Sequence, residues 1–357
     1  MKVRAIVLVC ILAMLLTACA RTHADLSADF SEAEVIAEGT DLHSYARDGV
    51  TFVSGTDLSG ALPGFHLTKK PLSSNITVYS GNDQLEITST AGIESAGAGQ
   101  ALRLSDDVLL PLDVLEEFPG LNILRDGQTV YISHRLDHSA IQPGVTIPVL
   151  MYHCISDDIW GYEPLFVSPH DFRAQMQYLL DHDYTPILFS DLDHLEDYEK
   201  PVIITVDDGY EDNYTNMFPI LKELEIPASV FMIASFIGKD LYLDAEQMRE
   251  MCDSGLVEFQ SHTYEHLHLS DHGPEEQEQT MIQSQLAITQ ATGRVPYVLS
   301  YPQGMFDQNT EALAAKYYSL GCRTKNTLWI TDDGYYHVNR LTVKHGISIE
   351  EFADLLK

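Results

Sequence analysis

A regular alternation of short apolar runs and longer amphipathic segments between residues 148 and 301 constrains the fold of this chain more than any other feature. The pattern predicts strands at 148–152, 202–206, 228–233, 256–260 and 296–301, and helices at 169–181, 213–225, 244–253 and 275–291. Parallel strands need such helix-length connections, so we expect an α/β fold with a parallel sheet or barrel. Side chains that carry chemistry are then expected at the carboxyl ends of the strands, where the loops converge.

The 357 residues exceed one average domain, and the first part of the chain has a different pattern. Residues 48–137 contain short β-branched runs separated by Gly, Asn and Asp, which predicts a small strand-rich domain. The stretch over residues 108–132 resembles the stalk module at the N-terminus of copper amine oxidases, which implies a spacer or a glycan-contacting role. Residues 138–146 are expected to be a linker, and residues 147–357 to form the α/β domain.

The N-terminus has the pattern of an export signal. Lys2 and Arg4 precede an apolar run over residues 5–16, and the segment Leu16-Thr17-Ala18-Cys19 resembles a bacterial lipobox. This resemblance implies cleavage before Cys19 and acylation of its thiol, which would anchor the chain to a membrane. The alternative is a plain secretory signal that contains a chance cysteine.

Cleavage at that point would remove residues 1–18 as a lipoprotein signal peptide. Residues 19–47, which follow, are polar and have no sustained period, so we expect a tether there. The predicted location is therefore extracytoplasmic, as a membrane-anchored lipoprotein on the bacterial cell surface.

The charge balance narrows the possible partners. The chain has 53 acidic and 21 basic residues, which gives a formal net charge of -32 at pH 7. This charge repels the phosphates of nucleic acids, so no nucleic-acid partner is expected. No pattern in the sequence predicts a protein partner.

A pair of adjacent carboxylates follows one of the predicted buried strands. The apolar run 202–206 leads directly into Asp207-Asp208-Gly209-Tyr210. Two neighbouring carboxylates repel each other in a partly dry site, so one of them could ligate a cation while the other acts as a base. The same four letters recur at residues 332–335, where an Asp-Gly turn is the better interpretation.

Two histidines follow another predicted strand, which ends at residue 260. His262 and His266 are four residues apart, so on a helical turn they would lie on one face and could chelate one divalent ion. The alternative is a solvated surface pair. Together with Asp208 they would form a three-ligand site with open positions, as expected of a catalytic metal.

These residues resemble the motifs of the polysaccharide deacetylases, carbohydrate esterase family 4. The resemblance covers residues 147–357, and it rests on Thr205-Val206-Asp207-Asp208-Gly209 and Ser261-His262-Thr263-Tyr264-Glu265-His266. It implies a distorted (β/α) barrel preceded by the small strand-rich domain.

The resemblance also implies roles for the matching residues. Asp208, His262 and His266 would bind a divalent metal, with zinc expected and cobalt or nickel as alternatives. Asp207 would be the base that activates water.

The family also needs a histidine acid to protonate the leaving amine. His153, in Val149-Leu150-Met151-Tyr152-His153, precedes the carboxylates, as in the circularly permuted branch that includes deacetylases of poly-N-acetylglucosamine. His345 is the rival candidate from the unpermuted order. A buried histidine at a strand end, bonded to backbone, is the structural alternative for His153.

The third motif of the family is altered here. Where an Arg-x-Pro-Tyr pattern is usual, the chain has Ser300-Tyr301-Pro302-Gln303-Gly304. Ser300 cannot brace the Asp207 carboxylate as an arginine would, so another cation such as Arg340 is needed. The backbone N–H of Gln303 could still stabilise an oxyanion, and Tyr301 and Pro302 are expected near the substrate.

The function implied is metal-dependent removal of acetyl groups from an N-acetylglucosamine-containing cell-surface polysaccharide, with release of acetate. An O-acetyl esterase acting on a glycan would share every motif. A non-catalytic glycan-binding lipoprotein is the alternative from another class, favoured by the missing arginine and disfavoured by the intact carboxylates and histidines.

Overall fold

The computed structural model describes residues 22–23, 26, 30–69, 74–80, 83–90, 98–116 and 121–357. The chain divides into two compact units, residues 1–135 and residues 136–357. The predicted lipidation site, Cys19, lies outside the described residues.

The first unit is built from strands. Its larger sheet has the order β1-β4-β5-β10-β9-β8-β7-β6 and its smaller sheet the order β11-β12-β2-β3. The strands are β1 (Ser31–Glu32), β2 (Glu34–Ala37), β3 (Thr40–Leu42), β4 (Ser44–Arg47), β5 (Val50–Ser54), β6 (His66–Lys69), β7 (Asn75–Ser80), β8 (Asp83–Thr90), β9 (Gln100–Arg103), β10 (Val108–Pro111), β11 (Leu121–Asp126) and β12 (Thr129–His134), with helices α2 (Gly55–Ala61) and α3 (Leu112–Leu115). The predicted strand-rich region is thus confirmed.

The expected tether over residues 19–47 is wrong from Ser31 onward. Strand β2 pairs in parallel with β12, which comes much later in the chain, and antiparallel with β3. Val35 and Ala37 on β2 are buried in the core of this unit. Strands this short carry no sustained period, and their partners are distant in sequence, so the local pattern could not reveal them.

The second unit contains the predicted parallel sheet, with the order β22-β21-β20-β19-β18-β14-β24 and with β17 paired to β18. Its strands are β13 (Thr146–Ile147), β14 (Val149–Tyr152), β15 (Cys154–Ile155), β16 (Phe166–Val167), β17 (Thr185–Ile187), β18 (Pro201–Asp208), β19 (Ala228–Met232), β20 (Val257–Ser261), β21 (Val298–Ser300), β22 (Leu320–Cys322), β23 (Trp329–Ile330) and β24 (Leu341–Thr342). The alternation of strands and helices read from the sequence is confirmed.

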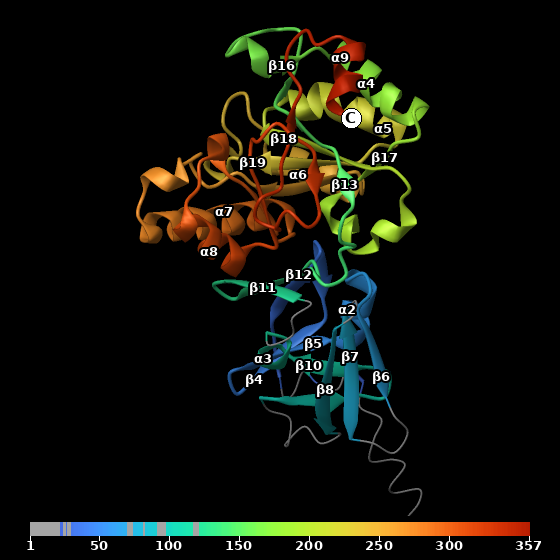
Figure 1. The fold of residues 1–357 in the computed structure, drawn as a ribbon. Coiled ribbons are helices and arrows are strands. Elements are labelled where there is room, and N and C mark those ends of the chain that lie inside the picture. The colour runs from blue at the N-terminus through green and yellow to red at the C-terminus, as the bar shows by residue number, and fades with distance from the viewer. Residues whose placement is uncertain are drawn as a thin grey trace, which may run out of the picture. The chain divides into compact units, whose positions relative to one another are not determined.

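The helices of this unit lie around the sheet. They are α4 (Pro169–Asp181), α5 (Phe218–Leu224), α6 (Ala245–Asp253), α7 (Pro274–Thr292), α8 (Gln308–Tyr317) and α9 (Ile349–Leu355). Figure 1 shows α7 beside α8, and α4 beside α5 and α9. Helix α4 begins after Ser168, whose side chain accepts from the Asp171 N–H, and α7 ends at Gly293 in the left-handed conformation. In the part of the chain that the structure describes, no helix is long and apolar enough to cross a membrane.

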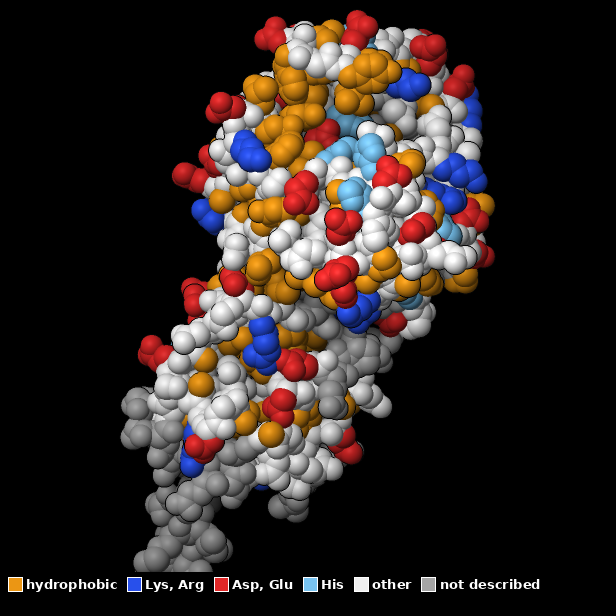
Figure 2. Space-filling view, turned by 90° about the vertical axis from the view of Figure 1, so that its left-hand side faces the viewer, with side chains coloured by type: hydrophobic (Ala, Val, Ile, Leu, Met, Phe, Trp, Pro, Cys, Tyr) orange, Lys and Arg blue, Asp and Glu red, His pale blue; other side chains and the backbone are white. Residues whose placement is uncertain are grey.

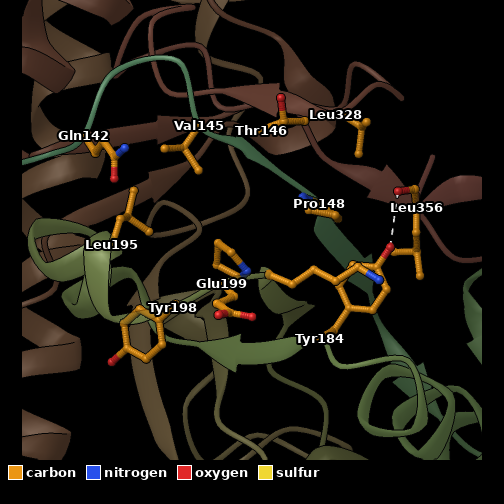
Figure 3. A pocket seen from close by; sticks show the side chains of 12 residues that line it. Gln142, Val145, Thr146, Pro148, Tyr184, Leu195, Tyr198, Glu199, Leu328 and Leu356 are labelled. Atoms are coloured by element: carbon orange, nitrogen blue, oxygen red, sulfur yellow. Dashed lines mark hydrogen bonds between the residues drawn. The ribbon is translucent and has the colours of Figure 1, made fainter.

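A cavity of about 430 Å³ lies at the amino ends of the central strands (Figure 3). Pro148 and Pro201, at the starts of β14 and β18, help to line it, with Tyr184, Tyr198 and Leu356 around them. The carboxylates Asp207 and Asp208 end β18, so this cavity is at the other end of the strand from them.

Candidate active site

Three metal-ligating side chains meet at the carboxyl ends of β18 and β20. One ligand atom each of Asp208, His262 and His266 lies within 4.8 Å of the other two. The Asp208 Oδ1 is 3.6 Å from His262 Nε2 and 3.9 Å from His266 Nε2. Strand β19 pairs with both β18 and β20, and through Met232 it sets Asp208 level with Ser261, the residue before His262. Two nitrogens and one carboxylate oxygen fit zinc and similar divalent ions.

The two histidines do not share a helical turn, so that expectation is wrong. Residues 262–266 form an irregular turn in which Thr263 and His266 have φ of 63° and 60°. The imidazoles nevertheless meet, with ring centroids 4.8 Å apart. The predicted proximity of the two imidazoles is therefore correct, but a tight turn produces it and not a helix.

The protonation of this cluster suits a metal site. His262 Nδ1 lies 2.9 Å from the Ser300 carbonyl oxygen, to which it can donate, so Nε2 is left to face Asp208. Burial and the neighbouring His262 lower the pKa of His266 to about 4. His266 is therefore neutral at pH 7, as a metal ligand must be.

Asp207 is buried beside this cluster and is paired with Arg340. The Arg340 Nη1 and Nη2 donate to the two carboxylate oxygens at 2.6 Å and 2.8 Å, and Arg340 has no exposed surface. Burial alone would raise the pKa of Asp207, but the charge of Arg340, helped by His262, holds it well below its usual range. Asp207 is therefore ionised at neutral pH.

Arg340 occupies the place that the altered third motif leaves open. Its Nη2 also donates to the Ser300 hydroxyl at 2.8 Å and its Nη1 to the Thr205 hydroxyl at 3.2 Å. Its guanidinium lies 5.3 Å from the centre of the Phe231 ring. Thr205, Ser300 and Phe231 were not singled out as its partners, because nothing local in the sequence links them to residue 340.

The two candidate histidine acids lie in different surroundings. Burial lowers the pKa of His153, and the charges of Asp207 and Asp208 act on it in the opposite direction, so it lies within electrostatic reach of both. His345 instead has its Nδ1 3.0 Å from the Phe166 carbonyl oxygen and its Nε2 3.9 Å from Glu163. The electrostatic influence of Asp207 and Asp208 on His153 therefore favours it over His345 for a role beside Asp207.

The third-motif residues have different positions. The Tyr301 ring is fully buried, stacks on Phe306 and donates to the Tyr336 carbonyl oxygen at 3.2 Å. It is a core residue, so the expected contact of its side chain with substrate is wrong. Pro302 is buried. Gln303 is exposed and has φ of 54°, a left-handed conformation that is uncommon for residues other than glycine and is found in tight turns.

Tyr210 is a site residue that the sequence reasoning missed. Burial and the charge of the neighbouring Asp208 raise the pKa of Tyr210 far above its usual range. Asp208 itself has φ of 76°, which is uncommon for a residue with a side chain. The tyrosine directly after Asp207-Asp208-Gly209 was the available signal.

Comparisons with known proteins agree with this geometry. The profile of the polysaccharide deacetylase family matches residues 195–319. YxkH of Bacillus subtilis, whose name assigns it to the polysaccharide deacetylases, is 34% identical over 213 residues, which cover 58% of this chain and 75% of YxkH.

Two further relatives carry more specific names. The poly-beta-1,6-N-acetyl-D-glucosamine N-deacetylase of Staphylococcus epidermidis is 25% identical over 210 residues, covering 54% of this chain and 71% of that protein. The deacetylase PplD of Streptococcus pyogenes, solved in complex with acetate, is 26% identical with a TM-score of 0.56, covering 60% of this chain and 99% of PplD. The second unit thus has the distorted (β/α) barrel of these enzymes, and the chain belongs to the polysaccharide deacetylase family.

Proposed function

We propose that this protein hydrolyses acetamide groups on an N-acetylglucosamine-containing cell-surface polysaccharide in a metal-dependent reaction that releases acetate. The observation that carries the proposal is the cluster of Asp208, His262 and His266 beside an ionised Asp207. The likeness to the Staphylococcus epidermidis N-deacetylase supports the choice of substrate.

Each residue has a part in the proposed reaction. Asp208, His262 and His266 would hold a divalent ion, which would supply Lewis-acid chemistry at the acetamide carbonyl. Asp207 accepts a proton from the attacking water, and Arg340 keeps that carboxylate ionised and fixed in orientation until it does.

The remaining steps use a proton donor and an oxyanion contact. His153, in its protonated form, donates a proton to the sugar nitrogen as the C–N bond breaks. The backbone N–H of Gln303, a residue in a tight turn, stabilises the negative charge on the former carbonyl oxygen. No covalent intermediate with the protein is required.

The first experiment measures acetate release from β-1,6-linked N-acetylglucosamine oligomers and from peptidoglycan, using residues 20–357. We expect release to stop with a chelator and to return with zinc, cobalt or nickel, with zinc proposed as the natural metal. Release from O-acetylated glycans alone would indicate an O-acetyl esterase. A protein that binds metal and glycan but releases no acetate from either substrate class would be a glycan-binding protein.

The metal site has its own test in two matched variants. Asp208→Asn removes a charged ligand and should reduce bound metal after dialysis to a small fraction of that in the unchanged protein. Asp332→Asn changes an exposed aspartate and should leave the metal content as it was. Equal metal content in the two variants would contradict the assignment of the site.

The location is proposed on the lipobox-like segment at Cys19. A lipid on this thiol would hold the protein at the outer face of the membrane, with the strand-rich unit as a spacer between lipid and enzyme. Cys19→Ser should move the protein from the membrane fraction to the medium or the soluble extract. Retention of the variant in the membrane fraction would contradict the lipid anchor.

A further inference from the structure

The loop between β15 and β16, residues 156–165, exposes large hydrophobic side chains. Ile159, Trp160 and Tyr162 are 44%, 47% and 71% exposed. Exposed aromatic side chains that gather in one short segment commonly mark a binding site.

The base of this loop is held in place from several sides. Strands β15 and β16 pair in parallel, and the Ser156 N–H donates to the Val167 carbonyl oxygen at 2.9 Å. At the far end of the loop, the His345 N–H donates to the Pro164 carbonyl oxygen at 3.2 Å. The loop therefore presents its aromatic residues from a fixed base.

Trp160 itself has a defined orientation. Its ring meets Phe166 edge to face, with centroids 5.2 Å apart and an angle of 86° between the planes. It meets Tyr210 in the same manner at 5.0 Å and 74°. One side of the indole is thereby packed, while nearly half of the residue stays open to a ligand.

These contacts connect Trp160 to the metal ligands. Tyr210 directly follows the Asp207–Gly209 segment, and its hydroxyl lies within electrostatic reach of the Asp208 carboxylate. On its other side Tyr210 lies 5.0 Å from the ring of Tyr242, whose neighbour Leu241 is exposed. Aromatic rings therefore lead from the surface to the proposed reaction centre. Figure 2 shows hydrophobic side chains next to histidines on the surface of this unit.

We propose that Trp160, supported by Tyr210, forms a stacking subsite for the sugar adjacent to the N-acetylglucosamine unit that is deacetylated. The C–H faces of a pyranose ring are apolar and flat enough to pack on an indole, and aromatic walls with a few polar groups are typical of such sites. This inference rests on the proposed function, and it makes Trp160 a determinant of specificity for polymeric substrate.

The charge of the same loop argues against insertion into a membrane. Asp157, Asp158 and Glu163 are exposed alongside the aromatic residues. Carboxylates at these positions would be repelled by anionic lipid headgroups and would be costly to bury. A neutral glycan would not repel these carboxylates and could bind while they stay exposed to solvent.

Tryptophan fluorescence offers a direct readout of the subsite. The chain contains two tryptophans. Trp160 is exposed, and Trp329 is fully buried. Titration of the metal-loaded Asp207→Asn protein with a β-1,6-linked N-acetylglucosamine tetramer should therefore change the emission, and Trp160→Phe in the same background should abolish that change.

Steady-state kinetics gives a second readout in the unmodified active site. Trp160→Ala should raise KM for the tetramer about 3- to 12-fold, and the monosaccharide should show little of this effect. Trp160→Phe, which keeps a ring, should recover part of the loss. Tyr198→Ala, which changes a tyrosine lining the cavity at the amino ends of the strands, is the control and should leave KM unchanged.

The outcomes separate the subsite from the reaction. Tetramer binding that depends on Trp160 without acetate release would keep the subsite and refute the proposed function. Acetate release with the same tetramer KM in Trp160→Ala would overturn the subsite. Weaker binding of Trp160→Ala to phosphatidylglycerol vesicles, together with an unchanged tetramer KM, would show a membrane contact in place of a glycan contact.

Discussion

The segment Asp-Asp-Gly-Tyr occurs twice in this chain, and its two copies have different surroundings. Asp207 and Asp208 are buried at the end of β18, whereas Asp332 and Asp333 are exposed in a turn after β23. The Asp333 N–H donates to the Ile330 carbonyl oxygen, and Asp332 accepts from the Gly144 N–H. Identical letters thus form a reaction centre in one place and a turn in the other.

The difference lies in what precedes and surrounds each copy. The buried strand β18 carries the first pair to the carboxyl edge of the sheet, where His262 and Arg340 lie within 4 Å of Asp207. The second pair follows a short strand, β23, that pairs with β13 in a two-stranded sheet. A carboxylate becomes catalytically useful when it is buried and has charged or metal-binding neighbours, and the four-residue segment alone provides neither condition.

The largest effect should come from replacing the first aspartate of each copy, because only the aspartate of the first copy is proposed to act in catalysis. Asp207→Asn removes the proposed base and should lower kcat by about 100- to 10,000-fold, while metal content is retained. Asp332→Asn, its exposed counterpart in the second copy, should leave kcat unchanged. Acetate release and metal content are measured for both, and comparable kcat values would contradict the role of Asp207.

The second prediction concerns Arg340, the cation that pairs with Asp207 and that, among the described residues, has no counterpart at the second copy. Arg340→Met leaves the Asp207 charge buried without its partner and should destabilise the second unit by about 3 to 5 kcal/mol. Both tryptophans lie in this unit, so urea unfolding followed by tryptophan fluorescence reports on it directly.

A double variant separates this charge effect from lost packing. Arg340→Met combined with Asp207→Asn should regain part of the stability, because no unpaired charge remains. A double variant that is less stable than Arg340→Met by the full cost of Asp207→Asn would show that the two side chains act independently.

Much of the second unit could be predicted because its pattern is local. A parallel strand buried on both faces must be apolar throughout, so residues 202–206 identified β18 from the letters alone. The helix expected over 169–181 has the bounds of α4, since Ser168 and Pro169 mark its start in the sequence. The carboxylates and histidines were then expected at strand ends, where the structure has them.

What escaped prediction depends on contacts between distant residues. The early strand β2 is completed by β12, and the burial of Tyr301 depends on Phe306 and Tyr336. The irregular turn at His262 involves positive φ angles at non-glycine residues, which no spacing rule anticipates. Arg340 was considered for its charge, but its pairing with both Asp207 oxygens and with Ser300 follows only from the fold.

The glycines of the two copies give a smaller contrast. Gly209 has φ of 78°, and a Cβ at this position would overlap the sulfur of Met232. Gly334 has φ of 99°, but a Cβ there would lie 3.6 Å from His337 Nδ1, an ordinary contact. Gly209→Ala should therefore cost about 2 to 5 kcal/mol from backbone strain and overlap together, and Gly334→Ala about 1 to 2 kcal/mol from strain alone. Urea unfolding of both variants measures the two losses of unfolding free energy. A larger loss in Gly334→Ala than in Gly209→Ala would contradict this prediction.

The tyrosines that end the two copies should give the smallest difference. The Tyr210 hydroxyl lies within electrostatic reach of Asp208, whereas the Tyr335 hydroxyl donates to the His138 carbonyl oxygen at 2.9 Å. Tyr335→Phe loses one hydrogen bond, worth about 0.5 to 1.5 kcal/mol. Tyr210→Phe removes a polar group beside a metal ligand, so metal affinity should weaken about 2- to 10-fold. Tyr335→Phe should change unfolding only, so a shift in metal affinity of equal size in both variants would mean that Tyr210 acts through stability and does not orient Asp208.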